Sequence, residues 1–442
     1  MPNAKSVIQA ILQKEYEDVT MLAMYSVVEV LREIWWLGVV ALLVSLGVTP
    51  LVRFIAYRAK IVDKPDALLK PHGRPIAYLG GVAMCIGLLV GLVVYAFVMP
   101  DASQWWNRLG EDLAEGRVGK LMGLDALVQN SSPRKAAEVT ANPAWQLLAI
   151  ALSSVLITIV GLLDDLFQIR PNQKVLGQVI AAVILIFGGV GLKISFVLFY
   201  HLHLPLPPPW AMILLSGLFC MVMVIATCNA TNLLDGLDGL CGGVTGIVTL
   251  GFLALAVFLA TYAHFDGTTD QLRVGLALAM AGAVFGFLPY NIPPASIFMG
   301  DAGSMLLGFF VAVMMAMFCR EGHVRFFLAA CVVFALPILD TALAVVRRLL
   351  AGKNIFAGDR SHLYDQLVDR GMSVKQVVVL FYILAAAAAI IGVLSAICLR
   401  TRYALLLDAV LLAVVWGIFL WLGMVHPDPR EAKPDSAPKD DA

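Results

Sequence analysis

The sequence predicts an all-α integral membrane protein, a polytopic bundle of about 10–11 transmembrane helices with cytoplasmic catalytic loops. Composition is the first reason, because 60% of the 442 residues are hydrophobic and only 14% are charged. Soluble chains carry roughly 25% charged residues. The second reason is that apolar runs of about 20 residues recur, and this length crosses a hydrocarbon core of about 30 Å. The third is that polar residues collect in five clusters between these runs, where they avoid the cost of facing lipid.

The apolar runs set the order of the predicted spans. We expect eleven, at residues 37–55, 78–99, 145–163, 175–190, 211–227, 244–263, 274–288, 305–318, 326–346, 377–398 and 404–424. Successive connections between spans alternate sides of the membrane. Each polar cluster follows an odd-numbered span, so all five are predicted to meet on one face.

Three segments fall outside the spans of this single membrane domain, 37–425. Residues 1–36 mix acidic and basic side chains and lack a signal-peptide pattern. An amphipathic surface helix and disorder both remain open for them. Residues 101–142 form the one long polar insertion, expected as an extracytoplasmic cap or interfacial helix. The tail, 426–442, is rich in Pro, Asp and Lys and is expected to be disordered in the cytoplasm.

Basic residues predict the orientation. Six Lys or Arg residues lie between Arg53 and Arg74, at the end of the first span and after it, and six more follow the ninth span, whereas the short connections on the other side contain few. Short basic loops stay in the cytoplasm. The five clusters are therefore expected on the cytoplasmic face of the cell membrane. The net charge of zero gives no reason to expect a nucleic-acid partner.

The second cluster pairs two carboxylates with a lysine. Asp164 and Asp165 end the third span in GLLDDLFQIRPNQK, and Lys174 begins the next, one helical turn before Gln178. Adjacent carboxylates at a helix end suit binding of a divalent cation or acceptance of a proton from a phosphate. A helix cap or a solvated loop pair is the structural alternative. Lys174 either binds phosphate as a point charge or snorkels to the membrane surface.

The third cluster, NATNLLDGLDGL, spans residues 229–240 and alternates amides and carboxylates with glycines. Its oxygen ligands are those that Mg²⁺ prefers, usually together with phosphate oxygens. Glycine lets the backbone approach a ligand closely. The spacing is not that of an EF-hand, so a ligand-binding loop is favoured over a calcium loop or a simple turn. The candidate residues are Asn229, Asn232, Asp235 and Asp238.

The fourth cluster, NIPPASIFMGDAGS, places Asn291 before two prolines and Asp301 between two glycines. Asp301 is expected to supply a second metal oxygen, and capping of the following helix, whose N-terminus favours anions, is the structural alternative, with which the metal role is compatible. Phe298 is expected to stack on a base or to anchor the loop.

The fifth cluster, in RRLLAGKNIFAGDRSHLYDQLVDRG, is basic. The guanidinium groups of Arg347, Arg348 and Arg360 match phosphate and sugar oxygens. His362 is suited to hydrogen bonding or proton transfer near neutral pH.

Together these motifs resemble the polyprenyl-phosphate N-acetylhexosamine-1-phosphate transferases, glycosyltransferase family 4, the superfamily of MraY and WecA. The resemblance extends from about residue 62 to 371, and the five motifs occur in family order. The first motif is VDKPDALLKPHGRPIAYLGG, which contains Lys70 and His72. The resemblance implies transfer of a sugar-1-phosphate from a UDP-sugar to polyprenyl phosphate at the bilayer, with release of UMP. It also implies a requirement for Mg²⁺, with Mn²⁺ as an expected substitute, and a homodimer as a candidate assembly.

The resemblance also assigns roles by motif position. Asn232 and Asp301 are expected to hold the metal and pyrophosphate. The expected catalytic residues are Asp164, Asp165, Asp235 and His362, with the two adjacent aspartates beside the lipid phosphate. The expected substrate-binding residues are Lys70, Lys174, Asn229, Asp238, Asn291, Phe298 and Arg360, of which Asp238 and Phe298 would recognise uracil.

One departure from the family pattern bears on the sugar. MraY-type enzymes carry a run of histidines in the last loop and WecA-type enzymes an HxHH pattern, whereas this chain has SHLYDQL with His362 alone. This favours a simple UDP-N-acetylhexosamine, GlcNAc first, over the muramoyl-pentapeptide donor of peptidoglycan synthesis. A secondary transporter is a remote alternative, because its charges belong near mid-bilayer on broken helices.

Overall fold

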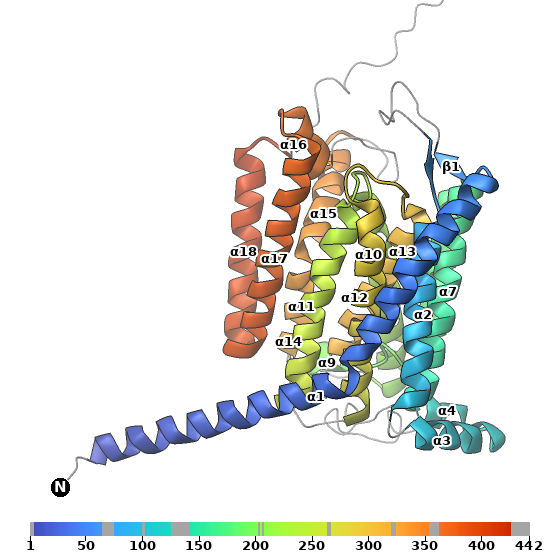
Figure 1. Ribbon diagram of the computed structural model, residues 1–442. Coiled ribbons are helices and arrows are strands. Elements are labelled where there is room, and N and C mark those ends of the chain that lie inside the picture. Colours follow the sequence, from blue (N-terminus) through green and yellow to red (C-terminus); the bar gives the residue numbers. More distant parts are fainter. Residues whose placement is uncertain are drawn as a thin grey trace, which may run out of the picture.

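The computed structural model describes residues 4–63, 75–99, 102–124, 141–201, 204–205, 207–262, 267–319, 324–352 and 362–425. These residues are almost entirely helical, and the long helices stand side by side as a bundle (Figure 1). Nine of the described helices are long and apolar enough to cross a membrane, or ten if one bent pair counts as a span. The structure therefore confirms the predicted class.

The helices and strands have the following bounds. The long helices are α1 (Ala4–Arg58), α2 (Gly80–Val98), α7 (Pro143–Phe167), α10 (Pro209–Leu234), α11 (Leu240–Tyr262), α12 (Gly267–Asn291), α13 (Gly300–Phe318), α17 (Val374–Cys398) and α18 (Thr401–Trp421). The shorter helices are α3 (Ala102–Ala114), α4 (Val118–Leu121), α8 (Pro171–Phe187), α9 (Ile194–His201), α14 (Val324–Val333), α15 (Ala335–Leu350) and α16 (Leu363–Asp369). Strands β1 (Val62–Asp63) and β2 (Ile76–Ala77) pair antiparallel, with Val62 opposite Ala77.

Two predicted spans differ from straight transmembrane helices. The fourth is α8, an apolar helix of only 17 residues. The ninth is the pair α14 and α15, bent by 69°. Pro337, in the first turn of α15, has no N–H to donate to the carbonyl of Val333, where α14 ends. The missing bond and the bulk of the proline ring account for the break.

The N-terminal helix continues through a proline. No helix end occurs at residue 36, where the N-terminal segment was expected to stop, and the candidate span runs Val27–Arg58. Pro50 lies inside this helix and leaves the carbonyl of Leu46 without its usual partner. The Tyr290 hydroxyl of α12 donates to that carbonyl at 3.1 Å. Helices α1 and α12 are therefore joined near the end of the bundle that carries the polar loops.

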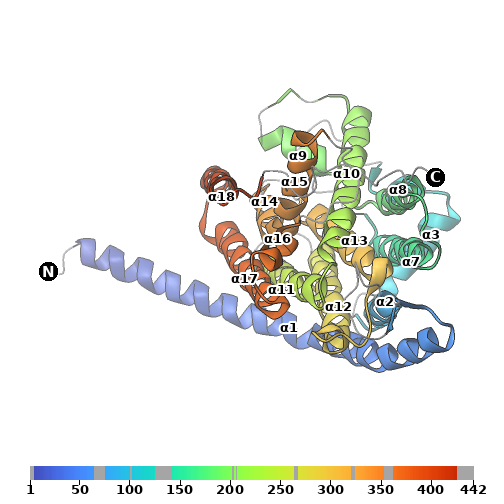
Figure 2. The same cartoon turned by 90° about the horizontal axis from the view of Figure 1, so that it is seen from above.

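Helix α13 forms the centre of the bundle. Every one of its residues except Asp301 is buried, and the view from above shows it surrounded by α7, α10 and α12 (Figure 2). A helix that is apolar all round belongs inside. Gly161 of α7 allows close approach, because a Cβ there would lie 2.4 Å from the Asp301 carbonyl oxygen. Small residues of this kind let membrane helices pack tightly.

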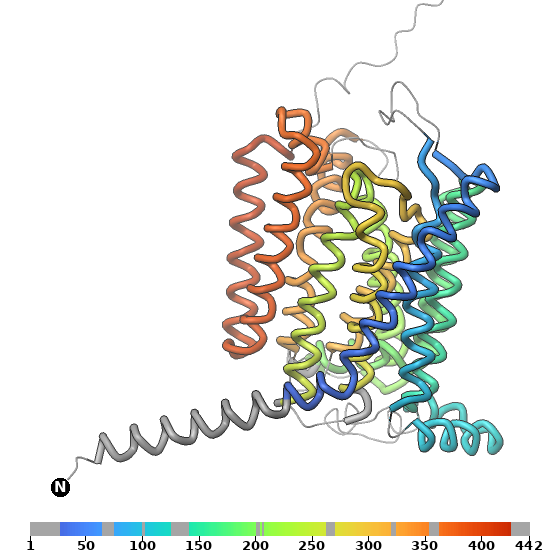
Figure 3. The backbone as a smooth tube through the Cα atoms, in the orientation of Figure 1, coloured from blue at the N-terminus to red at the C-terminus, as the bar shows by residue number. Residues whose placement is uncertain are grey.

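The two ends of the bundle differ. The described part of the 101–142 insertion forms α3 and α4, where the Trp106 indole donates to the Ala96 carbonyl at 2.8 Å. The tube in Figure 3 shows these helices at one end, with β1 and α16 at the other. The tail 426–442 lies outside the described residues.

Candidate active site

Four helices bring polar side chains to one point at the end of the bundle that carries β1 and α16. The Lys174 ammonium, in the first turn of α8, donates to Asp164 Oδ2 at 3.1 Å and to Asn232 Oδ1 at 3.2 Å. It also donates to Asp301 Oδ2. Asp164 lies in the last turn of α7, Asn232 in the last turn of α10 and Asp301 in the first turn of α13. The second, third and fourth clusters therefore meet, although up to 137 residues separate them along the chain.

The oxygen atoms of this group are held in place and remain reachable. The Asn232 amide donates to Asp301 Oδ1 at 2.7 Å and to Ser304 Oγ at 3.0 Å. Asn232 Oδ1 therefore faces Lys174 rather than rotating freely. The side chain of Asp301 is 27% exposed and that of Asp164 19%, which is enough for a ligand to reach both. We call Asp164, Lys174, Asn232 and Asp301 the charged cluster.

Asp165 has different partners from its neighbour. Its two carboxylate oxygens accept hydrogen bonds from the backbone N–H groups of Asp301 at 2.8 Å and Ala302 at 3.1 Å. Gly300 makes this contact feasible, since its φ is +67° and a Cβ there would lie 2.4 Å from Asp165 Oδ2. Asp165 thus caps α13 from another helix, as a carboxylate at a helix N-terminus should. Asp301 lies inside the first turn, so the alternative that Asp301 itself is the cap is wrong.

The turn between α10 and α11 is joined to the loop before α13. Asp238 Oδ2 accepts from the Ala295 backbone N–H at 2.9 Å. The Asn291 side chain accepts from Gly239 N–H at 3.1 Å and donates to the Ile297 carbonyl at 3.1 Å. Asp238 and Asn291 therefore fix the shape of the two loops. Their assignment as substrate contacts stays a prediction.

Asp235 lies in the same turn, directly after α10. Burial raises the pKa of its carboxyl well above the usual range, and the charges of Asp301, Asp165 and Asp238 raise it further. Such a group retains a proton more readily than an exposed aspartate. A raised pKa beside a charged cluster is typical of functional sites.

The end of the first motif, VDKPDALLKPHGRPIAYLGG, packs against the fourth cluster. The Phe298 backbone N–H donates to Ala77 O at 2.9 Å, and Gly80 N–H donates to Phe298 O at 3.0 Å. The Phe298 ring lies 5.9 Å from that of Tyr78. The expected substrate contacts Lys70 and Arg360 lie outside the described residues.

Asn229 lies one turn before Asn232 on α10. Its amide donates to the Ile225 carbonyl at 2.7 Å and to Gln178 Oε1 at 3.1 Å. Lys174 and Gln178 lie one turn apart on the same face of α8. Both side chains therefore reach α10, where Lys174 contacts Asn232 and Gln178 contacts Asn229.

His362 pairs with a residue that sequence reasoning missed. Its Nδ1 lies 3.0 Å from Asp340 Oδ2, and Asp340 Oδ1 accepts from Leu363 N–H at 2.6 Å. The ring of His362 stacks on Tyr364 at 5.6 Å, and the Tyr364 hydroxyl donates to Leu233 O at 3.1 Å. His362 therefore reaches the turn after α10 through Tyr364, and no direct contact with the charged cluster appears among the described residues.

Asp340 carried a signal in the sequence. It is the one carboxylate within the predicted span 326–346, and an ionisable residue inside a span is expensive and marks a site. Tyr364 gave no such signal. Its role depends on Gly236, where a Cβ would meet the Tyr364 hydroxyl at 2.1 Å.

The charged cluster suits a hard cation. Among the described residues, no group of three His, Cys, Asp or Glu side chains forms a metal site by itself. Asp164, Asn232 and Asp301 nevertheless direct three oxygens at one positively charged nitrogen. Mg²⁺ commonly takes one or two carboxylates and completes its shell with water and phosphate oxygens. The residues present therefore fit this ion.

Comparison with known proteins identifies relatives. Residues 147–319 match the profile of Glycosyl transferase family 4. The chain is 30% identical over 375 residues to the decaprenyl-phosphate N-acetylglucosaminephosphotransferase of Mycobacterium leprae, covering 80% of this chain and 81% of the relative. It is 28% identical over 349 residues to a probable undecaprenyl-phosphate N-acetylglucosaminyl 1-phosphate transferase of Bacillus subtilis, covering 78% and 80%. A phospho-N-acetylmuramoyl-pentapeptide-transferase of Heliobacterium modesticaldum is 35% identical over 254 residues, covering 55% and 73%.

Proposed function

The chain belongs to glycosyl transferase family 4, and from this premise we propose that it transfers N-acetylhexosamine-1-phosphate from a UDP-sugar to a polyprenyl phosphate. GlcNAc-1-phosphate is the preferred group, since the Mycobacterium leprae relative, 30% identical over 80% of this chain, and the Bacillus subtilis relative are named for N-acetylglucosamine transfer. The product is a lipid-linked sugar pyrophosphate, the starting point for a glycan of the cell envelope.

The observation that carries the proposal is the charged cluster. In the reaction, an oxygen of the acceptor phosphate bonds to the phosphorus that bears the sugar. The bond from that phosphorus to the bridging oxygen breaks, and UMP leaves with that oxygen. Both reactants are anionic, so cationic groups must offset their repulsion. Lys174 supplies one such charge from within a ring of oxygens.

The remaining roles follow from position. Asp164 lies beside Lys174 and is suited to accept the acceptor's proton. Asp165 holds the first turn of α13 and with it the backbone of Asp301. Asp238 and Asn291 keep the two loops together for the nucleotide. These roles make the aspartate pair unequal, with Asp164 acting on substrate and Asp165 acting through Asp301.

We propose Mg²⁺ as the cofactor, held by Asn232 and Asp301, with Mn²⁺ as a substitute. When bound, the ion neutralises charge on the phosphoryl oxygens. The donor set supports this, because the Asn232–Asp301 hydrogen bond of 2.7 Å already holds the two ligands together. The site is proposed to face the cytoplasm, where UDP-sugars are available, in line with the basic loops.

The muramoyl-pentapeptide donor is the second candidate, supported by the Heliobacterium relative. A second relative of that name matches 80% of this chain at 28% identity. The last motif argues against this donor, because it has one histidine in place of a run. Secondary transport has no support, because the charged cluster lies at helix ends rather than on broken helices at mid-bilayer.

The test supplies purified protein with undecaprenyl phosphate, Mg²⁺ and several radiolabelled UDP-sugars in parallel, including the muramoyl-pentapeptide donor. We expect labelled lipid and UMP from UDP-GlcNAc, no turnover after chelation, and recovery when Mg²⁺ is returned. Asp301→Asn should lower turnover about 100-fold or more, the scale of losing one electrostatic contact to the transition state.

Asp112→Asn is the matched control. Asp112 is also buried and ion-paired, with Arg117 at 2.9 Å, but it lies on α3 at the opposite end of the bundle. The Asp112→Asn variant should therefore have the same turnover as the natural protein. Product from none of the UDP-sugars would refute the enzymatic function, and near-normal turnover in Asp301→Asn would remove Asp301 from the metal set.

A further inference from the structure

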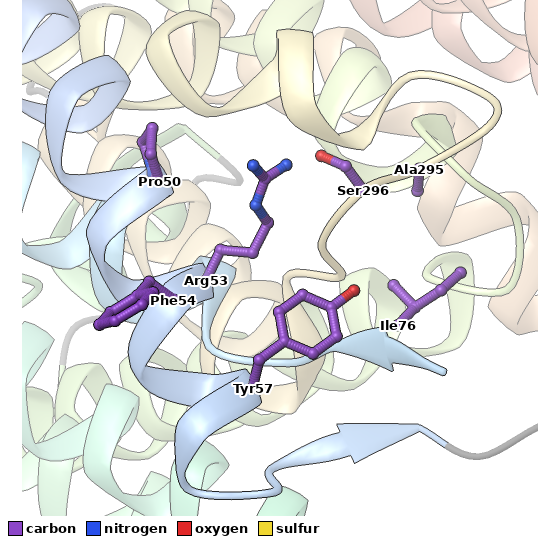
Figure 4. Close-up of a pocket in the computed structure, with 7 residues that line it drawn as sticks. All are labelled: Pro50, Arg53, Phe54, Tyr57, Ile76, Ala295 and Ser296. Atoms are coloured by element: carbon purple, nitrogen blue, oxygen red, sulfur yellow. The ribbon is translucent and has the colours of Figure 1, made fainter. Parts of the chain in front are cut away.

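A polar pocket lies beside the loop that precedes α13, apart from the charged cluster. It has a volume of about 390 Å³ and lies between the last turns of α1, strand β2 and residues 295–296 (Figure 4). Arg53, Phe54 and Tyr57 line it from α1, and Ala295 and Ser296 from the loop. The volume suits a lipid headgroup, and none of these residues belongs to the charged cluster.

Arg53 is the charged group of this pocket. Its guanidinium extends into the space between α1 and Ser296 (Figure 4). It is partly buried and makes no hydrogen bond or ion pair with any described residue. A partly desolvated guanidinium gains most from an oxyanion, because its fork of N–H donors matches phosphate or carboxylate oxygens. Among the described residues that line the pocket, Arg53 is therefore a cation with no carboxylate beside it.

The position of Arg53 along α1 indicates the kind of ligand. It lies five residues before the end of the candidate span Val27–Arg58, about 7–8 Å along the helix axis. Nearby, Leu51 is 57% exposed and Phe54 56% exposed, which suits contact with acyl chains. The pocket thus combines a cation at headgroup depth with apolar side chains next to it, and it fits an amphipathic anion.

The hydroxyl groups limit the charge that the pocket can hold. The Tyr57 hydroxyl donates to the Pro75 carbonyl at 3.2 Å, and Ser296 Oγ donates to the Tyr290 carbonyl at 2.9 Å. Both hydroxyl protons are used within the protein, so Arg53 is the one strong anion donor among the residues that line the pocket. One guanidinium balances a singly charged phosphodiester, whereas a phosphomonoester or a pyrophosphate carries more charge than it can offset.

We propose that this pocket binds the phosphodiester headgroup of an anionic phospholipid. Arg53 pairs with the phosphate, and the acyl chains lie along Leu51 and Phe54. The negative lipids of the cytoplasmic leaflet attract basic groups near the membrane surface.

The pocket is connected to the loop between α12 and α13. Tyr290 binds the Leu46 carbonyl of α1 through its hydroxyl, and its own carbonyl accepts from Ser296 N–H at 2.8 Å. Next to Ser296, Ala295 donates its N–H to Asp238. A lipid that contacts Ala295 and Ser296 therefore restricts the conformation of the loop that leads to Asp301. From this we infer that anionic lipid raises turnover, a consequence that rests on the proposed transferase function.

Binding is tested first, because it requires no activity. The full-length protein is titrated with phosphatidylglycerol or phosphatidylcholine, and bound lipid is counted by native mass spectrometry. Arg53→Gln should weaken phosphatidylglycerol binding about tenfold, the effect of losing one charge-assisted contact. Arg53→Lys should retain part of it.

Arg58→Gln is the matched control. Arg58 lies on the same helix and stacks over Phe54 at 4.8 Å, but does not line the pocket. Its binding should change less than twofold. Equal loss in both variants would show general attraction to the membrane surface and overturn the site. Thermal unfolding of each variant confirms that it is folded.

Two further arms identify the source of the phosphate. Inorganic phosphate that displaces phosphatidylglycerol in an Arg53-dependent way would show a site for free anions and overturn the proposal. If undecaprenyl phosphate binds in an Arg53-dependent way and phosphatidylglycerol does not, the pocket belongs to the acceptor lipid, and this result would also overturn the proposal.

Turnover in nanodiscs of phosphatidylcholine, with and without phosphatidylglycerol, tests the coupling. The natural protein and Arg58→Gln should be stimulated by phosphatidylglycerol, and Arg53→Gln should not. Stimulation that persists in Arg53→Gln would overturn the coupling. If no UDP-sugar is used in any nanodisc, the proposed function fails, whereas the binding measurement still decides the lipid site.

Discussion

Asp164 and Asp165 are adjacent in sequence and identical in chemistry, yet the structure gives them separate partners. Asp164 contacts the Lys174 ammonium, whereas Asp165 accepts two backbone N–H groups of α13. At a helix end, successive side chains point about 100° apart, so one faces the charged cluster and the other faces the neighbouring helix. The contact of Asp164 with Lys174 suits a residue that acts on substrate. The cap formed by Asp165 suits a residue that positions α13.

This division predicts different consequences for the two asparagine variants. Asp165→Asn should lower stability by about 1 kcal/mol, because it removes one of the two oxygens that accept from the first turn of α13. It should lower turnover as well, since Asp301 lies in that turn. Asp164→Asn should lower turnover with a much smaller change in Tm. Thermal unfolding and turnover measured side by side check this, and equal Tm shifts would contradict the assigned roles.

At the scale of elements, Asp340 of α15 contacts His362 and the first turn of α16, and this contact positions the histidine of the fifth cluster. Asp340 is 1% exposed and His362 4% exposed, and their contact is charge-assisted if the imidazole is protonated. Asp340 also holds the first backbone N–H of α16. With Nδ1 facing Asp340, the other ring nitrogen of His362 is left for a different partner. We infer that Asp340 is a positioning residue for His362.

A double-mutant cycle tests that inference. Asp340→Asn and His362→Gln should each lower kcat about tenfold or more, and the double variant should be little worse than the more affected single variant. Asp408→Asn is the control, because Asp408 is likewise a carboxylate within a membrane helix, on the mostly exposed α18. Additive losses would mean that Asp340 supports folding alone.

At the scale of the whole molecule, a bundle of membrane-spanning helices places its two ends on opposite sides of the membrane. Lys60 is exposed near β1, and Glu115 is exposed between α3 and α4 at the opposite end. Because short basic loops are retained inside, we propose that Lys60 lies on the cytoplasmic side.

Cysteine labelling checks the orientation. Lys60→Cys should react with an impermeant maleimide only after the cells are permeabilised, and Glu115→Cys should react in intact cells. The background is a variant without Cys331 and Cys398, because the other five cysteines are buried. Labelling of both new cysteines from the same side would refute the proposed topology.

Some features of the fold and of the charged cluster could be predicted from the sequence, and others could not. The composition and the length of the apolar runs predicted a helical membrane bundle, because the cost of exposing polar backbone to lipid leaves few alternatives. Alternation of the spans predicted that Asp164, Lys174, Asn232 and Asp301 lie on one face, and the structure brings them into contact. The bend at Phe334 was missed because a proline near a helix start is also compatible with a straight span.

The sequence by itself determined the fold class, the family and the identities of the charged cluster, since these depend on hydropathy and on motif chemistry along the chain. Only the tertiary structure decided that Asp165 caps α13, that Asp340 holds His362, and that Arg53 faces a pocket beside Ser296. These pairings join residues from different helices, and their partners depend on how helices rotate and pack against one another. Spacing along one chain carries no information about that rotation.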